Sequence, residues 1–164
     1  FGKRAATGVT PRMKYFYWDI RPTPEFGTVE VRVFDTPLSI DRAAQLAAYV
    51  QALGAWFLSE QPFEPQEDDY LVYTYNRFQA CRFGLDGSYV HPASSEAFSL
   101  RSHIAQTLQQ VMPHAGAEGK EALQQLAQVL NSDDGNDASW LRARYGAVRQ
   151  LPEVVRQAAL RFRA

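Results

Sequence analysis

Two short segments, Trp18-Asp-Ile-Arg-Pro22 and Thr28-Val-Glu-Val-Arg-Val33, decide the architecture of this chain. In both, apolar and polar side chains alternate, which is the pattern of a β-strand with one apolar and one polar face. The stretch between them contains proline and glycine, which are typical of turns. The sequence therefore predicts an antiparallel hairpin with its valine face in the core and with strands at 13–21 and 28–34.

The polar face of this hairpin carries an unusual concentration of charge. The expected cross-strand pairs are Arg21 with Thr28, Asp19 with Glu30, and Tyr17 with Arg32. Side chains opposite each other lie about 4.5–5.5 Å apart at Cβ, so two carboxylates would meet, with arginines diagonal to them. A slip of two residues would keep the same four charged groups on this face. One interpretation is a site for magnesium and phosphate; the other is a solvent-facing hairpin with surface ion pairs.

The remainder of the chain reads as helical, which makes the fold class α+β, a hairpin portion followed by several helices. Thr36 or Ser39 is the expected N-cap of the first helix, and Gly84 ends the second. The first helix is apolar nearly all round, so we expect it to be buried on most sides, by another part of the protein or by a second subunit. A short strand or loop is expected at 88–91. The expected helices cover 40–58, 70–83, 100–112, 120–130, 138–148 and 152–162.

Composition excludes several classes of function. The chain has 164 residues and a net charge of −1, without the basic stripe of a nucleic-acid-binding protein. No segment reaches the roughly 20 apolar residues of a membrane span. The lone cysteine, Cys81, fits a reducing compartment, and we expect a cytoplasmic protein. The acidic loop at 131–137 lacks the spacing of a calcium loop and is expected to cap the next helix.

Several motifs in order resemble the glutamate–cysteine ligase family, and within it the bacterial YbdK-type carboxylate–amine ligases. Besides the hairpin, these motifs are Glu67-Asp-Asp-Tyr70, Asn76-Arg-Phe-Gln-Ala-Cys-Arg-Phe-Gly-Leu-Asp-Gly87 and Asp137-Ala-Ser-Trp-Leu-Arg142. The resemblance covers essentially the whole chain. It implies a glutamine-synthetase-like catalytic fold and a ligase that uses ATP and Mg²⁺ to join a small-molecule carboxylate to an amine through an acyl phosphate.

The resemblance also implies roles for individual residues. Glu30 corresponds to a metal ligand, and Arg32 to the arginine that neutralises the transferring phosphate. Arg21 and, less directly, Asp19 correspond to groups near the substrate carboxylate. Asn76, Arg77 and Arg82, on the helix at 70–83, are further candidates for contact with nucleotide or substrate. The alternative for the two arginines is structural ion pairing. Arg142 is a candidate by resemblance alone.

The resemblance is to the carboxy-terminal part of a single catalytic domain, here residues 1–37 as loop and hairpin and 38–164 as mainly helical. Family members complete the metal site with glutamates from the amino-terminal half, so we expect that half as a partner and an inactive isolated chain. A homodimer is the alternative cover for the apolar helix. Two other hypotheses remain open at this point: a non-catalytic helical interaction module, and a kinase-like phosphotransferase that shares the nucleotide site.

Overall fold

The hairpin belongs to the first of two compact units, Phe1–Pro37 and Leu38–Ala164, in a computed structural model. The structure describes residues 18–66, 68–132 and 136–163, and each unit is described by itself. The fold class is α+β, as expected. The entering loop at 1–12 and the part of the first predicted strand at 13–17, with Tyr17, lie outside the described residues. The likeness to glutamine synthetase stays a prediction.

Strands β1 (Ile20–Thr23) and β2 (Thr28–Val31) pair antiparallel around the short 3₁₀ helix η2 (Pro24–Phe26). Gly27 follows η2 with φ +60°, the left-handed region in which glycine is favoured, so this turn depends on it. Pro22 lies within β1, although it was expected to end the strand. The backbone N–H of Arg32 donates to the carbonyl of Asp19 at 2.7 Å. The alternation of antiparallel pairing then places Pro22 at a non-hydrogen-bonded position, where the missing N–H costs nothing.

The predicted register was wrong by two residues. Arg21 pairs with Glu30, and Thr23 with Thr28. The reason is the length of the turn: η2 and Gly27 occupy residues 24–27, so the strands meet two residues later on β1 than expected. Consequently the two carboxylates are not opposite each other, and Glu30 faces an arginine instead. The cross-strand repulsion that the sequence suggested is absent from this register.

The burial of the two hairpin faces also differs from the expectation. Ile20 and Val29 on the apolar face are 58% and 63% exposed, whereas the Arg21 and Glu30 residues are only partly exposed. The valine face is therefore not a core in this chain, because a two-stranded hairpin has no second layer of its own.

The second unit contains the predicted helices. Ser39 is the N-cap of the first, and its hydroxyl accepts from the N–H of Arg42 at 3.1 Å. Gly84 ends the second helix, and Asn136 caps the helix after the acidic loop by accepting from Ser139 N–H at 2.9 Å; residues 133–135 of that loop lie outside the described residues. The helices are α2 (Ile40–Glu60), α3 (Asp69–Phe83), α4 (Leu100–Val111), α5 (Ala117–Leu130), α6 (Asp137–Val148) and α7 (Leu151–Arg163), with η3 (Gly84–Asp86) and η4 (Met112–His114).

A second hairpin pairs β3 (Ser88–Val90) with β4 (Ala97–Ser99). The structure thus confirms the strand at the position where the sequence left a strand or a loop open, and β4 was not predicted. Asp137 of α6 accepts from the backbone N–H of Leu38 at 2.9 Å, which ties the beginning of this unit to α6. Among the described helices, none is long and apolar enough to cross a membrane.

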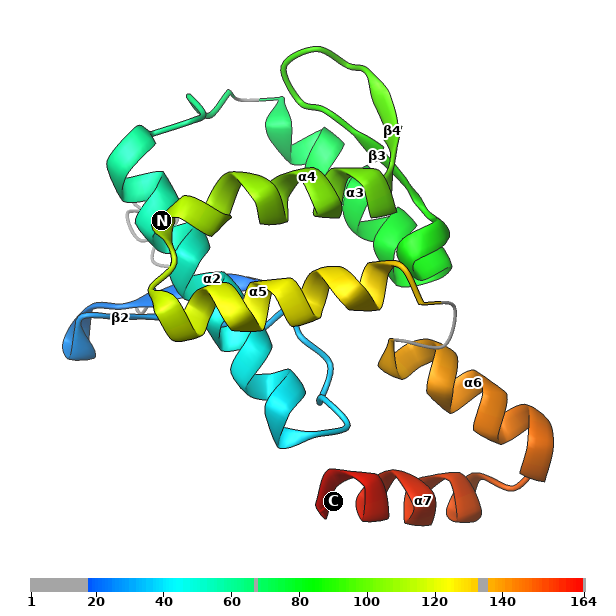
Figure 1. Cartoon of the computed structure of the whole chain (residues 1–164). Helices are drawn as coiled ribbons and strands as arrows, with labels where there is room; N and C mark the ends of the chain where they lie inside the picture. Colours follow the sequence, from blue (N-terminus) through cyan, green and yellow to red (C-terminus); the bar gives the residue numbers. More distant parts are fainter. Residues whose placement is uncertain (1–17, 67, 133–135, 164) are drawn as a thin grey trace, which may run out of the picture. The chain divides into compact units, whose positions relative to one another are not determined.

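The core of this unit lies where α2, α4 and α5 pack together (Figure 1). Leu123 of α5 and Val111 of α4 have no exposed surface, and Trp56 of α2 is 6% exposed. Within this chain α2 packs against α4 and α5 while Ile40 and Leu58 are exposed. The expected cover of the rest of the helix, by another part of the protein or by a second subunit, stays a prediction.

The histidine in α4 predicts a dependence of stability on pH. The ring of His103 stacks on that of Tyr89 with centroids 3.5 Å apart. Burial, and to a smaller extent the nearby His91, lower the pKa of His103 below its ordinary 6.5. The unfolded chain therefore binds the proton more readily than the folded chain, so acidification through pH 6.5 should destabilise the fold.

We expect the melting temperature to fall between pH 7.5 and 5.5, and to fall less in a His103→Gln variant, which has no proton to take up. Thermal melts of both proteins at the two pH values measure this difference. Equal changes in melting temperature in the two proteins would contradict the role of His103. The variant also loses the ring stacking, but this loss applies at both pH values and so cancels in the difference.

Candidate functional site

The polar face of the β1–β2 hairpin is the candidate site. Because Arg21 and Glu30 are directly opposite, Nη2 of Arg21 lies 2.5 Å from Oε2 of Glu30. Arg32 follows Glu30 by two residues and so lies on the same face; its Nε is 3.8 Å from Oε1 of Glu30. Each carboxylate oxygen of Glu30 therefore faces a different guanidinium.

Burial and charge distinguish the members of this trio. The Arg21 side chain is 16% exposed, that of Arg32 33% and that of Glu30 42%. Alternation places Asp19 on the same face, so its two arginines and two acids are formally balanced in charge, and the guanidinium groups are of the kind that binds a carboxylate or phosphate. Asp19, half-buried, contributes its backbone carbonyl to Arg32. The structure thus brings together four predicted residues, Asp19, Arg21, Glu30 and Arg32, with partners different from those expected.

The other predicted residues, Asn76, Arg77 and Arg82, lie on α3, in the second unit. The side-chain amide of Asn76 is paired with the backbone of Val90 in β3: its oxygen accepts from the N–H and its nitrogen donates to the carbonyl, both at 2.8 Å. Asn76 therefore joins α3 to β3, and its predicted contact with a ligand stays a prediction.

Replacing Asn76 with alanine should destabilise the chain by about 2 kcal/mol, because it leaves both backbone groups of Val90 without this partner. Urea denaturation of residues 1–164 measures the change. Asn76→Asp keeps the acceptor and loses the donor, so it should fall between alanine and wild type. An Asn76→Ala protein of unchanged stability would contradict this role.

Arg77 and Arg82 are exposed on α3 and point about 140° apart around the helix axis. Arg82 lies over the ring of Phe83, with 5.8 Å between its guanidinium carbon and the ring centroid. The structure therefore gives Arg82 an aromatic contact. One acidic residue that was considered as an ion-pair partner, Glu67, lies outside the described residues. The two arginines do not converge on one atom.

Two groupings in the second unit were missed by the sequence reasoning. The guanidinium carbons of Arg144 and Arg161 lie 5.4 and 4.9 Å from the centroid of the Trp140 ring, and Oδ1 of Asp137 is 3.6 Å from Nη2 of Arg161. The spacing of four residues between Trp140 and Arg144 on a helix was a usable signal, whereas Arg161 is distant in sequence. Arg142 is exposed on the same helix.

The second grouping lies around His114, at the rim of a hollow between α2 and the start of α5. His114 Nε2 is 2.8 Å from Oε1 of Glu60, and its Nδ1 is 3.2 Å from the hydroxyl of Ser59. Trp56 donates its indole N–H to the other oxygen of Glu60 at 3.0 Å. These contacts tie the end of α2 to the turn between α4 and α5.

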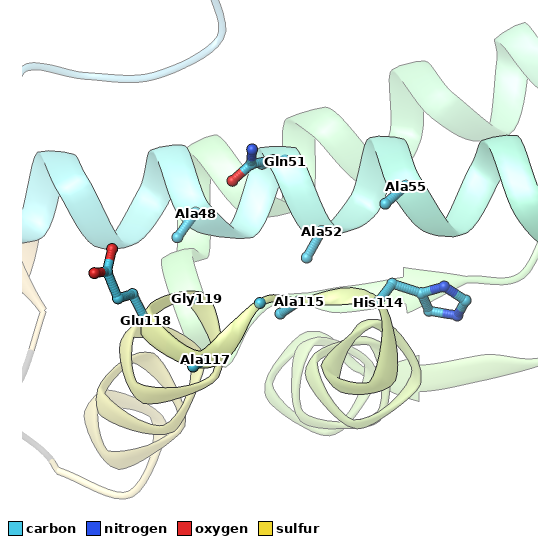
Figure 2. Close-up of a pocket in the computed structure, with 10 residues that line it drawn as sticks. Ala48, Gln51, Ala52, Ala55, His114, Ala115, Ala117, Glu118 and Gly119 are labelled. Atoms are coloured by element: carbon cyan, nitrogen blue, oxygen red, sulfur yellow. The ribbon is translucent and has the colours of Figure 1, made fainter.

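The hollow itself has a volume of about 490 Å³. Figure 2 shows Ala48, Ala52 and Ala55 on the side of α2 that faces Ala115–Gly119, with the His114 ring at one end. Its polar lining consists of Gln51, His114 and Glu118, and the rest is alanine and glycine. Because His114 is already engaged with Glu60 and Ser59, the hairpin face is the stronger candidate site. Among the described residues, no group of three or more His, Cys, Asp or Glu side chains is arranged to hold a metal ion.

Comparisons with known proteins show the family of this chain. Residues 3–158 match the model of glutamate-cysteine ligase family 2 (GCS2), and the chain belongs to that family. Curated relatives carry the name "Putative glutamate--cysteine ligase 2". One from Acidovorax sp. (strain JS42) is 61% identical over 99% of this chain and 44% of its own length. Others, from Polaromonas naphthalenivorans (strain CJ2) and Ralstonia pickettii (strain 12J), are 60% and 55% identical over 99% of this chain and 43% of their own lengths. The chain thus spans less than half the length of these relatives.

Proposed function

We propose that this chain is the carboxy-terminal part of an ATP-dependent carboxylate–amine ligase. The observation that carries the proposal is the hairpin face on which Glu30 lies between Arg21 and Arg32, in a chain of the glutamate–cysteine ligase family 2. Guanidinium groups bind carboxylate and phosphate oxygens through paired donors, and the reaction requires both kinds of anion to be held close together.

Magnesium fits this face in part. Mg²⁺ is commonly held by one or two carboxylates together with substrate phosphates, and Glu30 supplies one such carboxylate. Glu30 would hold the ion here, with further ligands from outside the described residues. When bound, magnesium neutralises charge on the phosphate oxygens of ATP. The arginines would supply the remaining charge neutralisation and the orientation of the acid.

The proposed reaction has two steps. A carboxylate oxygen of the acid attacks the terminal phosphorus of ATP; ADP leaves and an acyl phosphate forms. The amine nitrogen then attacks the acyl carbon, phosphate leaves with the C–O bond electrons, and the nitrogen loses a proton to give the amide. Arg32 would neutralise the transferring phosphoryl group, while Arg21, with Asp19 beside it, would orient the acid. Positioning and charge neutralisation are the main requirements of such chemistry.

The test requires a full-length protein, by which we mean residues 1–164 together with the segment that the relatives carry outside the match. Substituting residues 1–164 for the matched part of the Acidovorax relative gives such a protein. Incubation with ATP, Mg²⁺ and a panel of acids and amines, with glutamate and cysteine first, should release ADP only when all components are present, and mass spectrometry should find an amide. Residues 1–164 alone should give no turnover, because the further magnesium ligands would come from the part of the full-length protein that they lack.

The same experiment distinguishes the alternatives. A stable phosphorylated acid without amide would indicate a phosphotransferase, and no ADP release under any condition would indicate a non-catalytic module whose hairpin charges are surface ion pairs. We also infer a cytoplasmic location, since the exposed, unpaired Cys81 thiol suits a reducing compartment.

A further inference from the structure

Three apolar side chains form a stripe along the outside of α3. Leu71, Tyr75 and Phe78 follow the i, i+4, i+7 spacing, which keeps them within about 60° of one another around the helix. They are 70%, 44% and 58% exposed. We call these three residues the α3 stripe.

The opposite part of α3 is already occupied by the second hairpin. Asn76 pairs with Val90, and the Gln79 side chain accepts from the backbone N–H of Ser88 at 3.2 Å. Around the helix, Asn76 is about 100–160° from all three residues of the stripe. Gln79 is about 80–100° from Leu71 and Phe78 but only about 40° from Tyr75, to whose hydroxyl its side-chain nitrogen donates at 3.3 Å. Leu71 and Phe78 therefore lie on a side of α3 that these contacts with β3 do not use, and Tyr75 lies at the border of that side. No residue of α3 is buried.

Such a stripe is characteristic of an interface. Single exposed apolar residues are ordinary on protein surfaces, but aligned ones that include Tyr and Phe mark contact sites. Side chains of this size stabilise a protein when they pass from exposure to burial. At their present exposure the three residues add little of this to residues 1–164, so a surface that covers them would account for their apolar character.

The lengths of the relatives indicate what could cover the α3 stripe. Each carries more than half of its residues outside the segment that matches this chain. A segment joined covalently to α3 is present at an effective concentration in the millimolar range, well above that of a second copy in solution. We propose that the α3 stripe packs against this remaining part of the full-length protein. The inference rests on the full-length arrangement proposed above and not on its chemistry.

Hydroxyl-radical footprinting with mass spectrometry tests this directly. We expect Tyr75 and Phe78 to be oxidised at the same rate in residues 1–164 at every protein concentration, and at least about fivefold more slowly in the full-length protein. Equal rates in the two proteins would overturn the proposal. Protection of residues 1–164 that grows with concentration would assign the stripe to a second copy, and protection by a non-hydrolysable ATP analogue would assign it to nucleotide; either result also overturns the proposal.

A pair of variants gives a second readout. Leu71→Lys should leave the melting temperature of residues 1–164 almost unchanged, because Leu71 is already in solvent, and lower that of the full-length protein by several degrees. Ala80→Lys is the matched control, exposed and half a turn away on the same helix. It should leave both proteins unaffected. If Tyr75 and Phe78 are protected in a full-length protein that shows no ligase turnover, this inference stands and the proposed function is refuted.

Discussion

Replacing Glu30 with glutamine is expected to lower the turnover number of the full-length protein at least about 10²-fold, the usual cost of removing a group that organises charge at a reacting centre. Glutamine keeps the shape of the side chain and removes its charge. Arg21 and Arg32 then lose the carboxylate that lies 2.5 and 3.8 Å from them, and the proposed magnesium site would lose its ligand from this hairpin. ADP release at saturating acid, amine and ATP measures the effect, and a magnesium titration should show a weaker apparent affinity.

Stability should be nearly unaffected by this change. The Glu30 side chain is 42% exposed, and ion pairs at that exposure contribute about 0–1 kcal/mol. Glu25→Gln is the matched control: Glu25 is exposed in the turn of the same hairpin and should retain wild-type turnover. A Glu30→Gln protein with turnover within about threefold of wild type would remove Glu30 from the site.

That these charged residues share one face of the hairpin could be predicted from the sequence, but which of them pair could not. Alternation alone places Arg21, Glu30 and Arg32 on one face, and a slip of two residues leaves that unchanged. Which groups meet depends on how many residues the turn uses. The 3₁₀ turn at 24–26 and the left-handed Gly27 set that number, and no local pattern in the strands reports it.

The helices illustrate the same division between local and distant causes. Ser39, Gly84 and Asn136 mark helix ends through contacts within a few residues, so they could be read directly. The role of Asn76 could not, since its partner is fourteen residues away in β3. The apolar surface of α2 indicates that most of the helix is covered, but the pattern does not say which part of the protein supplies the cover.

Leu123→Ala is expected to destabilise residues 1–164 by about 3 kcal/mol, within the range that leucine-to-alanine changes cost in buried sites. Leu123 has no exposed surface and belongs to the cluster with Trp56, Leu108 and Val111 where α2, α4 and α5 meet. The cost combines the transfer energy of the lost carbons with the cavity they leave. Since domains of this size are typically stable by about 5–15 kcal/mol, a loss of this magnitude should shift the urea midpoint clearly.

Leu58→Ala controls for the chemistry of the substitution. Leu58 is 84% exposed near the end of α2, so the same atoms are removed without opening a cavity, and the change should stay within about 0.5 kcal/mol. Equal effects of the two variants would mean that the three-helix cluster is not the stabilising core of this chain. A much larger effect of Leu58→Ala in the full-length protein than in residues 1–164 would show instead that the exposed end of α2 is covered there, as we propose for the α3 stripe.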